Sequence, residues 1–148
     1  GGGGGGGGGG VMSGGGGAPV VVGGAVADLL AAPAAGTALL LRTSNPGTLS
    51  ISPGGVARNI AEALARLGCS PRLVSAVGAD GLGAIVLESL SRPRGGGSLS
   101  SVNTEHVAVI EGERTATYTA LMDEANDLCA AVADMSVHRC GRVRASHG

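Results

Sequence analysis

Two adjacent glycines, Gly54 and Gly55, stand directly before a strongly helical pattern, and this junction constrains the fold more than any other feature. Residues 56–67 repeat apolar side chains at helical spacing, and Gly68 fits the left-handed position that ends a helix. A glycine pair at such a place either makes a tight turn or lets a ligand approach the backbone. In the second case, the backbone N–H groups and the positive end of the helix would face that ligand.

The patterns on either side predict strands and a second helix. Residues 20–22 suit a strand buried on both faces, ended by Gly23 and Gly24. Residues 36–52 read as two short strands, near 39–41 and 49–51, around an Asn-Pro-Gly turn. Strands are also expected at 71–78 and 106–112, a helix capped by Asp80 at 81–90, and a hairpin over 115–135. The order predicts an α/β sheet plus a separate small β-layer made of two hairpins.

The predicted core faces of the helices follow from their periodicity. In the first helix we expect the larger apolar residues to face the core and the charged residues to lie on other faces. The core residues would be Val56, Ile60, Leu64 and Leu67, and the charged ones Arg58, Glu62 and Arg66.

Composition narrows the function classes. A net charge of −1 argues against a nucleic-acid or polybasic membrane surface, and no apolar run is long enough to span a membrane. The 3 cysteines and 3 histidines show no metal-ligand spacing, so no metal site is expected. Residues 1–17 are expected to be a disordered polyglycine leader and 139–148 a disordered or unrelated tail, which leaves 18–138 as the ordered part.

Asp28 and Asn59 could join the glycine pair in binding a polyol. Asp28 follows shortly after the first strand and can accept hydrogen bonds from two neighbouring hydroxyls. Asn59 lies one helical turn beyond the glycines and can offer a donor and an acceptor. From the pattern alone, the simpler interpretation is preferred: a glycine-rich turn, a capping Asp and a surface Asn.

The segments "SNPGTLSISPGGVARNIAEALARLG" and "LVSAVGADGLG" resemble the N-terminal half of the ribokinase-like (PfkB) carbohydrate kinases. "PGGVARN", together with "RTATYTALMD" and "AVADM", is most similar to the pseudouridine kinases within that family. The resemblance implies a Rossmann-type α/β/α domain with a β-sheet lid, formed by residues 37–52 and 114–135. It also implies transfer of the ATP γ-phosphate to the ribose 5′-hydroxyl of pseudouridine.

The resemblance also assigns roles to individual residues. Those that match sugar-hydroxyl contacts are Asp28, Gly54, Gly55 and Asn59, while Asn45 and Tyr118 would face the substrate from the lid. Asp80, Gly81 and Gly83 match an element interpreted as structural. Arg58 is either polar surface or a phosphate contact.

Catalytic and ATP-binding residues are not expected in this chain. It contains neither a "DTxGAGD"-type run, which supplies the anion hole and general base of the family, nor a P-loop. The complete enzyme would use ATP and Mg²⁺, while this chain alone would bind neither and would not transfer phosphate. Because half of the sheet would be missing, one strand edge and one core face should be exposed.

Alternatives remain at this point. The substrate could instead be ribose, fructose or adenosine, or the chain could be a non-catalytic remnant that binds substrate or dimerises through the lid. The resemblance also leaves open a glycosidase fused to the full-length protein. A dinucleotide-binding oxidoreductase fails on spacing, because no GxGxxG follows the strand at 20–22 and Asp28 comes too soon after it. The cytoplasm is the default compartment, with an organelle such as the peroxisome left open.

Overall fold

The computed structural model describes residues 17–91 and 101–139. All but Gly17 of the predicted leader lies outside these residues, as do most of the loop after residue 91 and nearly all of the predicted tail. The elements follow the predicted order of strand, hairpin, helix, strand, helix, strand and hairpin. They are β1 (Val20–Val22), β2 (Val26–Pro33), β3 (Gly47–Gly54), α1 (Val56–Arg66), β4 (Arg72–Gly78), α2 (Gly81–Ser91), β5 (Val107–Ile110), β6 (Thr117–Met122), β7 (Leu128–Asp134) and the 3-10 helix η1 (Ser136–His138).

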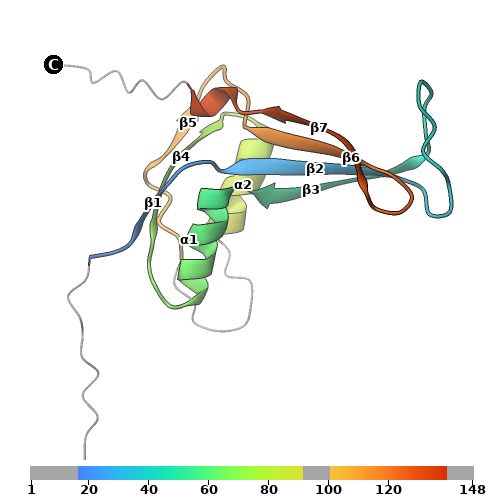
Figure 1. Cartoon of the computed structure of the whole chain (residues 1–148). Coiled ribbons are helices and arrows are strands. Elements are labelled where there is room, and N and C mark those ends of the chain that lie inside the picture. The colour runs from blue at the N-terminus through green and yellow to red at the C-terminus, as the bar shows by residue number, and fades with distance from the viewer. Residues whose placement is uncertain (1–16, 92–100, 140–148) are drawn as a thin grey trace, which may run out of the picture.

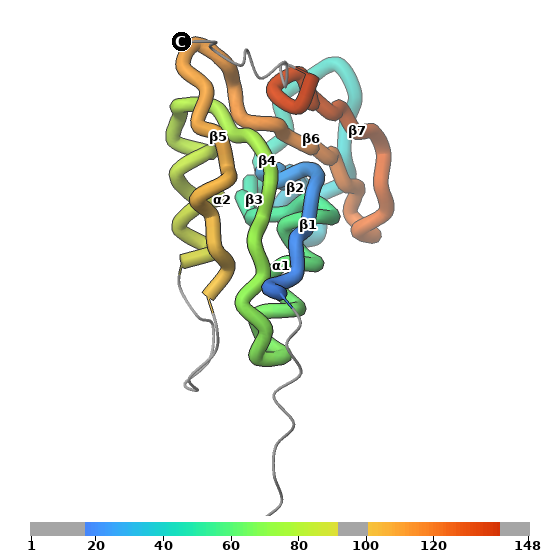
Figure 2. The backbone as a smooth tube through the Cα atoms, turned by 90° about the vertical axis from the view of Figure 1, so that its left-hand side faces the viewer, coloured from blue at the N-terminus to red at the C-terminus, as the bar shows by residue number. Residues whose placement is uncertain are grey.

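The first sheet consists of parallel strands in the order β1-β4-β5. Both α-helices lie on the same face of this sheet (Figures 1 and 2). Small and branched side chains fill the core between them, with Ala61, Leu73, Val77 and Val86 all 0% exposed. The sequence has no Phe or Trp, so close backbone packing rather than large aromatic rings fills this core.

The second sheet, called the lid below, has the strand order β3-β2-β6-β7. β2 pairs antiparallel with β3 and parallel with β6, and β6 pairs antiparallel with β7, which places the two hairpins side by side. Figure 1 shows the lid extending away from the helices. Its far end, residues 34–46 and 123–127, is called the tip, and its near end, residues 24–28, 54–56, 115–118 and 134–138, is called the root. The predicted α/β sheet with a separate β-layer is therefore confirmed.

The first hairpin differs from the prediction. Residues 39–41 were expected to form a strand but lie in the loop between β2 and β3, and the partner of β3 is β2, which begins at Val26. β2 is rich in alanine and leucine, which have low strand propensity by themselves. β2 forms a strand because β3 and β6 pair with its two edges. Local sequence patterns do not indicate such pairing between distant segments.

The predicted core face of α1 is wrong. Val56 and Leu67 are 77% and 79% exposed, and Ile60 is 47% exposed. The buried apolar residues of this helix are instead the alanines Ala57, Ala61 and Ala65. A Cβ added at Gly23 would lie 3.1 Å from the Ala57 Cβ, so the helix approaches the chain too closely there for a larger side chain. Helical periodicity alone predicts that the larger apolar residues face the core, whereas the close approach of the helix to Gly23 leaves room only for alanines there.

The prediction that β1 is buried on both faces is also wrong. Val20 and Val22 are 60% and 72% exposed. In the described part of the chain, no helix covers these side chains, because both α-helices pack against the opposite face. This agrees with the expectation that one core face is left exposed.

Candidate ligand-binding site

A cavity of about 310 Å³ lies at the root of the lid. The walls come from the link between β1 and β2, the lid strands β2 and β6, the start of α1 and the segment after β7. Its lining residues are Gly24, Val26, Asp28, Gly55, Val56, Tyr118, Met135 and His138. Among the predicted site residues, Asp28, Gly55 and Tyr118 meet here, and Gly54 lies directly beside Asp28. The volume falls within the range of small-molecule sites.

Strand register explains how residues so far apart in the sequence reach one cavity. Asp28 of β2 pairs with Tyr118 of β6. One position earlier, Thr117 pairs with Ala27 on one side and with Asp134 on the other. The chain that leaves β7 therefore returns to the start of β2, where the cavity lies.

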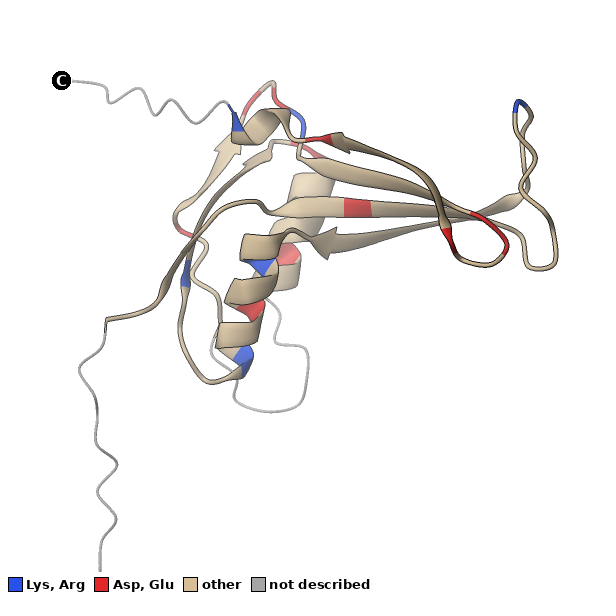
Figure 3. Cartoon of the chain, in the orientation of Figure 1, with Lys and Arg blue, Asp and Glu red and all other residues tan. Residues whose placement is uncertain are grey.

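Asp28 follows the end of β1 by a few residues, as the sequence pattern predicts, and it lies inside β2, a strand that was not predicted. Charged side chains are sparse along the lid strands (Figure 3), and Asp28 is the only one in β2. Within residues 17–91 and 101–139, no group donates a hydrogen bond to its carboxylate, and burial raises the pKa of Asp28. A partly buried carboxylate without a partner is suited to accept hydrogen bonds from the hydroxyls of a ligand.

The glycine pair is required by close contacts at the root. A Cβ at Gly54 would overlap the Asp28 carboxylate, and a Cβ at Gly55 would overlap the carbonyl oxygen of Gly24. Gly55 also has a φ of 95°, in the region that favours glycine. It precedes α1 without a side-chain cap, and the first turn of α1 has no acidic residue, so the positive end of the helix is not neutralised locally.

Asn59 does not line the cavity. Its Oδ1 accepts a hydrogen bond of 3.1 Å from Arg58 Nη1, which leaves the amide Nδ2 as the group available to a ligand. The sequence predicts that Asn59 offers both a donor and an acceptor, whereas this geometry favours the donor alone.

Arg58 is buried, so its interpretation as polar surface is wrong. The residue is 4% exposed, and its Nη1 lies 2.6 Å from Glu62 Oε2. Nη2 donates a 3.2 Å hydrogen bond to Ser89 Oγ of α2. Arg58 therefore links α1 to α2 and, through Asn59, supports the start of the site.

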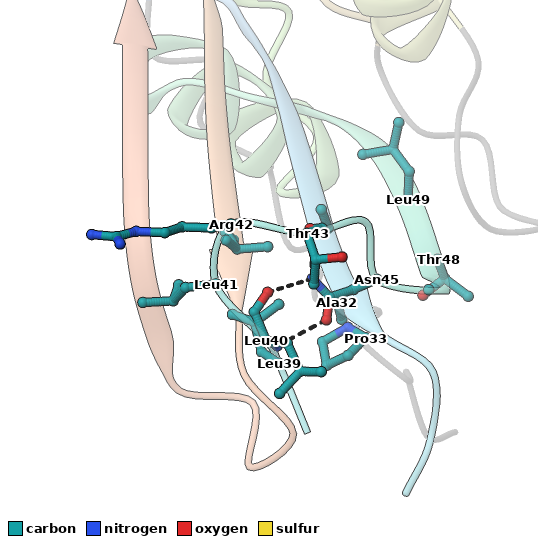
Figure 4. A pocket seen from close by; sticks show the side chains of 13 residues that line it. Ala32, Pro33, Leu39, Leu40, Leu41, Arg42, Thr43, Asn45, Thr48 and Leu49 are labelled. Atoms are coloured by element: carbon teal, nitrogen blue, oxygen red, sulfur yellow. Dashed lines mark hydrogen bonds between the residues drawn. The ribbon is translucent and has the colours of Figure 1, made fainter. Parts of the chain in front are cut away.

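Asn45 lies at the tip, beside a different cavity of about 490 Å³ that shares no lining residue with the root cavity. Figure 4 shows its amide bonded to Leu40: Nδ2 donates to the Leu40 carbonyl and Oδ1 accepts from the Leu40 N–H, both at 2.8 Å. Nδ2 also lies 3.3 Å from the Thr43 carbonyl oxygen. Asn45 and Asp28 therefore line different cavities, and the Asn45 amide stabilises the loop between β2 and β3.

Asp80 has the structural role that the sequence predicts. Its Oδ1 accepts a 2.8 Å hydrogen bond from the Gly83 N–H, which caps α2. Its carboxylate also accepts bonds from the Thr115 N–H at 2.8 Å and the Thr115 hydroxyl at 2.6 Å. Burial by itself would raise the pKa of Asp80, but the hydrogen bonds from Thr115, Gly83 and Leu82 outweigh it and lower the pKa. Asp80 therefore fastens the start of the second lid hairpin to α2.

His138 and Met135 line the root cavity although the sequence analysis gave them no role in it. His138 was considered only as a metal ligand, because no local pattern distinguishes it. Strand topology could have identified these residues. The second hairpin starts with β6, which pairs parallel with β2, so its antiparallel second strand, β7, ends where β2 begins.

Residues 17–91 and 101–139 contain no group of three or more His, Cys, Asp or Glu side chains that could hold a metal ion. Over the same residues, no helix is long and apolar enough to cross a membrane. The polar groups of the candidate site are the Asp28 carboxylate, the His138 imidazole and the backbone at the glycines, and the rest of its lining is largely apolar.

The structure thus combines an α/β domain, a β-sheet lid and a cavity of small-molecule size at the root of the lid. The sequence profile described as "pfkB family carbohydrate kinase" matches residues 20–139. The chain belongs to the pfkB carbohydrate kinase family.

Similar proteins include nucleoside kinases of different specificity. The chain is 37% identical over 94 residues to pseudouridine kinase from Escherichia coli strain K12, covering 64% of this chain and 28% of that enzyme. It is 34% identical over 84 residues to guanosine-inosine kinase from Exiguobacterium acetylicum, covering 57% of this chain and 25% of that enzyme. This chain thus spans only about a quarter of these relatives.

Solved structures show the same fold. Arabidopsis thaliana ribokinase, determined in complex with ribose and ATP, superimposes with a TM-score of 0.64 at 23% identity, over 79% of this chain and 36% of that one. The predicted ribokinase-like fold class is therefore confirmed.

Proposed function

We propose that this chain forms the sugar-binding part of an ATP-dependent kinase that phosphorylates the ribose 5′-hydroxyl of pseudouridine. Family membership supports phosphotransfer to a sugar or nucleoside, and the similarity to pseudouridine kinase supports that substrate. The observation that carries the proposal is the root cavity, where a partly buried carboxylate without a partner faces uncapped backbone at the start of α1.

In this proposal the residues of the chain bind and orient the sugar. Asp28 accepts hydrogen bonds from two ribose hydroxyls, and the bare backbone at Gly54 and Gly55 lets the sugar ring approach. Asn59 lies outside the cavity lining, one turn along α1, and the proposal gives it a donor role through Nδ2, while Arg58 already uses one acceptor position of its Oδ1. Tyr118 lies next to Asp28 in the sheet and packs against the base.

ATP and Mg²⁺ belong to the complete kinase in this proposal, and residues 17–91 and 101–139 hold no group of three or more His, Cys, Asp or Glu side chains that could bind a metal ion. We assign no phosphoryl-transfer step to this chain, because the sequence contains neither the general-base motif of the family nor a P-loop. We expect the purified chain to show no pseudouridine-dependent ATP turnover.

The remaining parts of the proposal concern partners and location. Exposed apolar side chains on the outer lid strands, Leu49 and Ile51 of β3 and Leu128 and Val132 of β7, support dimerisation through the lid. A glycosidase fused to the complete kinase and a cytoplasmic location are further expectations. The alternatives are kinases for ribose, fructose or adenosine, and a remnant that binds substrate without catalysis.

Isothermal titration of the purified chain with pseudouridine tests this function. We expect saturable binding that Asp28→Asn weakens by about tenfold or more, because a buried charge-assisted acceptor is lost. Asp127→Asn, which changes an exposed carboxylate at the tip, is the matched control and should leave the affinity unchanged. Absence of binding, or equal losses in the two variants, would contradict the proposal.

A further inference from the structure

The root cavity contains a second polar side chain without a partner. His138 lines the cavity, and its Nε2 is buried with no hydrogen-bond partner among the described residues. Arg58 Nε is the other such atom in that part of the chain, but the remaining Arg58 nitrogens bind Glu62, Asn59 and Ser89. The His138 side chain makes no hydrogen bond to another residue of 17–91 and 101–139, so its imidazole has more capacity left for a ligand than the Arg58 guanidinium has.

The imidazole ring lies against the backbone that also supports the glycine pair. A Cβ added at Gly24 would lie 3.1 Å from His138 Cε1. The carbonyl oxygen of Gly24 would overlap a Cβ placed on Gly55. The same oxygen accepts a 3.4 Å hydrogen bond from the Arg58 N–H in the first turn of α1. His138 and Gly55 are thus both in contact with one glycine, and the ring belongs to the same wall as the start of α1.

An apolar surface accompanies the imidazole. Val26 and Val137 are buried there, with Tyr118 and Met135 packed against them. Met135 and Tyr118 also line the cavity. An aromatic and a thioether side chain suit the face of a flat ring, and a nearby imidazole nitrogen suits one directional hydrogen bond.

Buried polar atoms in proteins are nearly always hydrogen-bonded, because a buried atom without a partner has lost its hydrogen bonds to water and gained none in return. A ligand in the cavity can remove this cost at Nε2, whereas the apolar neighbours of His138 cannot. The unpaired nitrogen therefore points to a polar group on the ligand.

We propose that His138 is a specificity-determining residue whose Nε2 hydrogen-bonds the base of a ribonucleoside held in the root cavity. Asp28 and the glycine pair hold the ribose, while Tyr118, Met135 and His138 select a nucleoside over the free sugar. The inference rests on the proposed function and adds to it the residue that recognises the base.

The test compares two substitutions that differ in where they place a polar atom. Gln carries its terminal amide near the position of Nε2, whereas Asn carries it near Nδ1. Titration of the purified chain with pseudouridine and with ribose should show His138→Asn weakening pseudouridine binding by about tenfold. Ribose binding should stay unchanged, and His138→Gln should recover most of the pseudouridine affinity. His106→Asn, at an exposed histidine outside the cavity, is the control.

Thermal unfolding of the ligand-free variants separates recognition from folding. Since Nε2 has no partner in the chain, His138→Asn should leave the melting temperature unchanged or raise it. A lower melting temperature with unchanged pseudouridine affinity would overturn the inference, as would equal losses for both ligands. If Asp28→Asn abolishes binding while His138→Asn has no effect, this inference fails and the proposed function stands. If the unmodified chain binds neither ligand, both fail.

Discussion

The root and the tip of the lid are built from the same strands but use their polar groups in opposite ways. At the tip, both polar atoms of the Asn45 amide are bonded to Leu40. At the root, the Asp28 carboxylate and His138 Nε2 have no partner within the described residues. The tip cavity is the larger, about 490 Å³ against 310 Å³. Polar groups that are at least partly buried and have no partner, rather than volume, therefore distinguish the candidate ligand site.

The largest expected effect concerns the backbone at the root. Gly55→Ala should lower the free energy of unfolding by about 2–4 kcal/mol, because the new Cβ overlaps the Gly24 carbonyl and φ is positive. Gly36→Ala at the tip is the matched control, since Gly36 has a φ of 76° but open space around it. It should cost only about 1 kcal/mol. Urea unfolding measures both, and equal losses would show that the root is not tightly packed.

Gly54→Ala should affect binding more than folding. Its Cβ would meet the carboxylate of Asp28, the flexible end of a side chain that can rotate away. We expect about a tenfold loss of pseudouridine affinity, equivalent to about 1.4 kcal/mol, with a smaller change in unfolding free energy than Gly55→Ala causes. Unchanged affinity in a destabilised protein would show that the position of Asp28 does not matter.

Asn45→Ala should show the reverse behaviour at the tip. Loss of the two bonds to Leu40 should reduce the free energy of unfolding by about 1 kcal/mol and leave ligand affinity unaltered. Asn45→Asp keeps the acceptor for the Leu40 N–H but places a carboxylate oxygen against the Leu40 and Thr43 carbonyl oxygens, so it should cost at least as much. A loss of pseudouridine affinity in Asn45→Ala would place the tip in the binding site.

The smallest effect is a difference in pH dependence between two carboxyls at the root. Hydrogen bonds from Arg114 and Ser136 lower the pKa of Asp134 to about 2 from 3.8. Its stabilising contribution is therefore present above pH 3.8 and is lost as the pH falls through about 2. Burial raises the pKa of Asp28, so its contribution is present below 3.8 and is lost as the pH rises through the raised value.

Thermal unfolding between pH 2 and pH 7 tests these signs, a window set by the lowered and raised pKa values. Asp134→Asn should remove part of the acid destabilisation, and Asp28→Asn should raise the melting temperature at neutral pH. A lower melting temperature for Asp28→Asn at neutral pH would mean that the carboxylate has a stabilising partner.

Local sequence patterns predicted the elements whose signals are local. The glycine pair before α1, the cap at Asp80 and the left-handed Gly68, whose φ is 84°, all stand where expected. Such features depend on neighbours within a few residues, so the sequence contains the information directly.

Features set by tertiary contacts could not be predicted in the same way. β2 depends on pairing with strands on both sides, and the alanine face of α1 depends on how closely the helix approaches Gly23. In the candidate site, the sequence pattern singled out Asp28 and Gly55 and the family resemblance added Tyr118, but Asn45 lies at the tip and His138 was missed. The return of β7 to the root, which brings His138 to Asp28, appears only with the strand register.

The most direct test of the account is a nuclear magnetic resonance titration of the ¹⁵N-labelled chain with pseudouridine. We predict that amide shifts of Gly24, Gly55 and Tyr118 at the root change with ligand concentration, while those of Leu40 and Asn45 at the tip do not. Changes confined to the tip, or no saturable change at the root, would contradict the claim that the root of the lid binds the substrate.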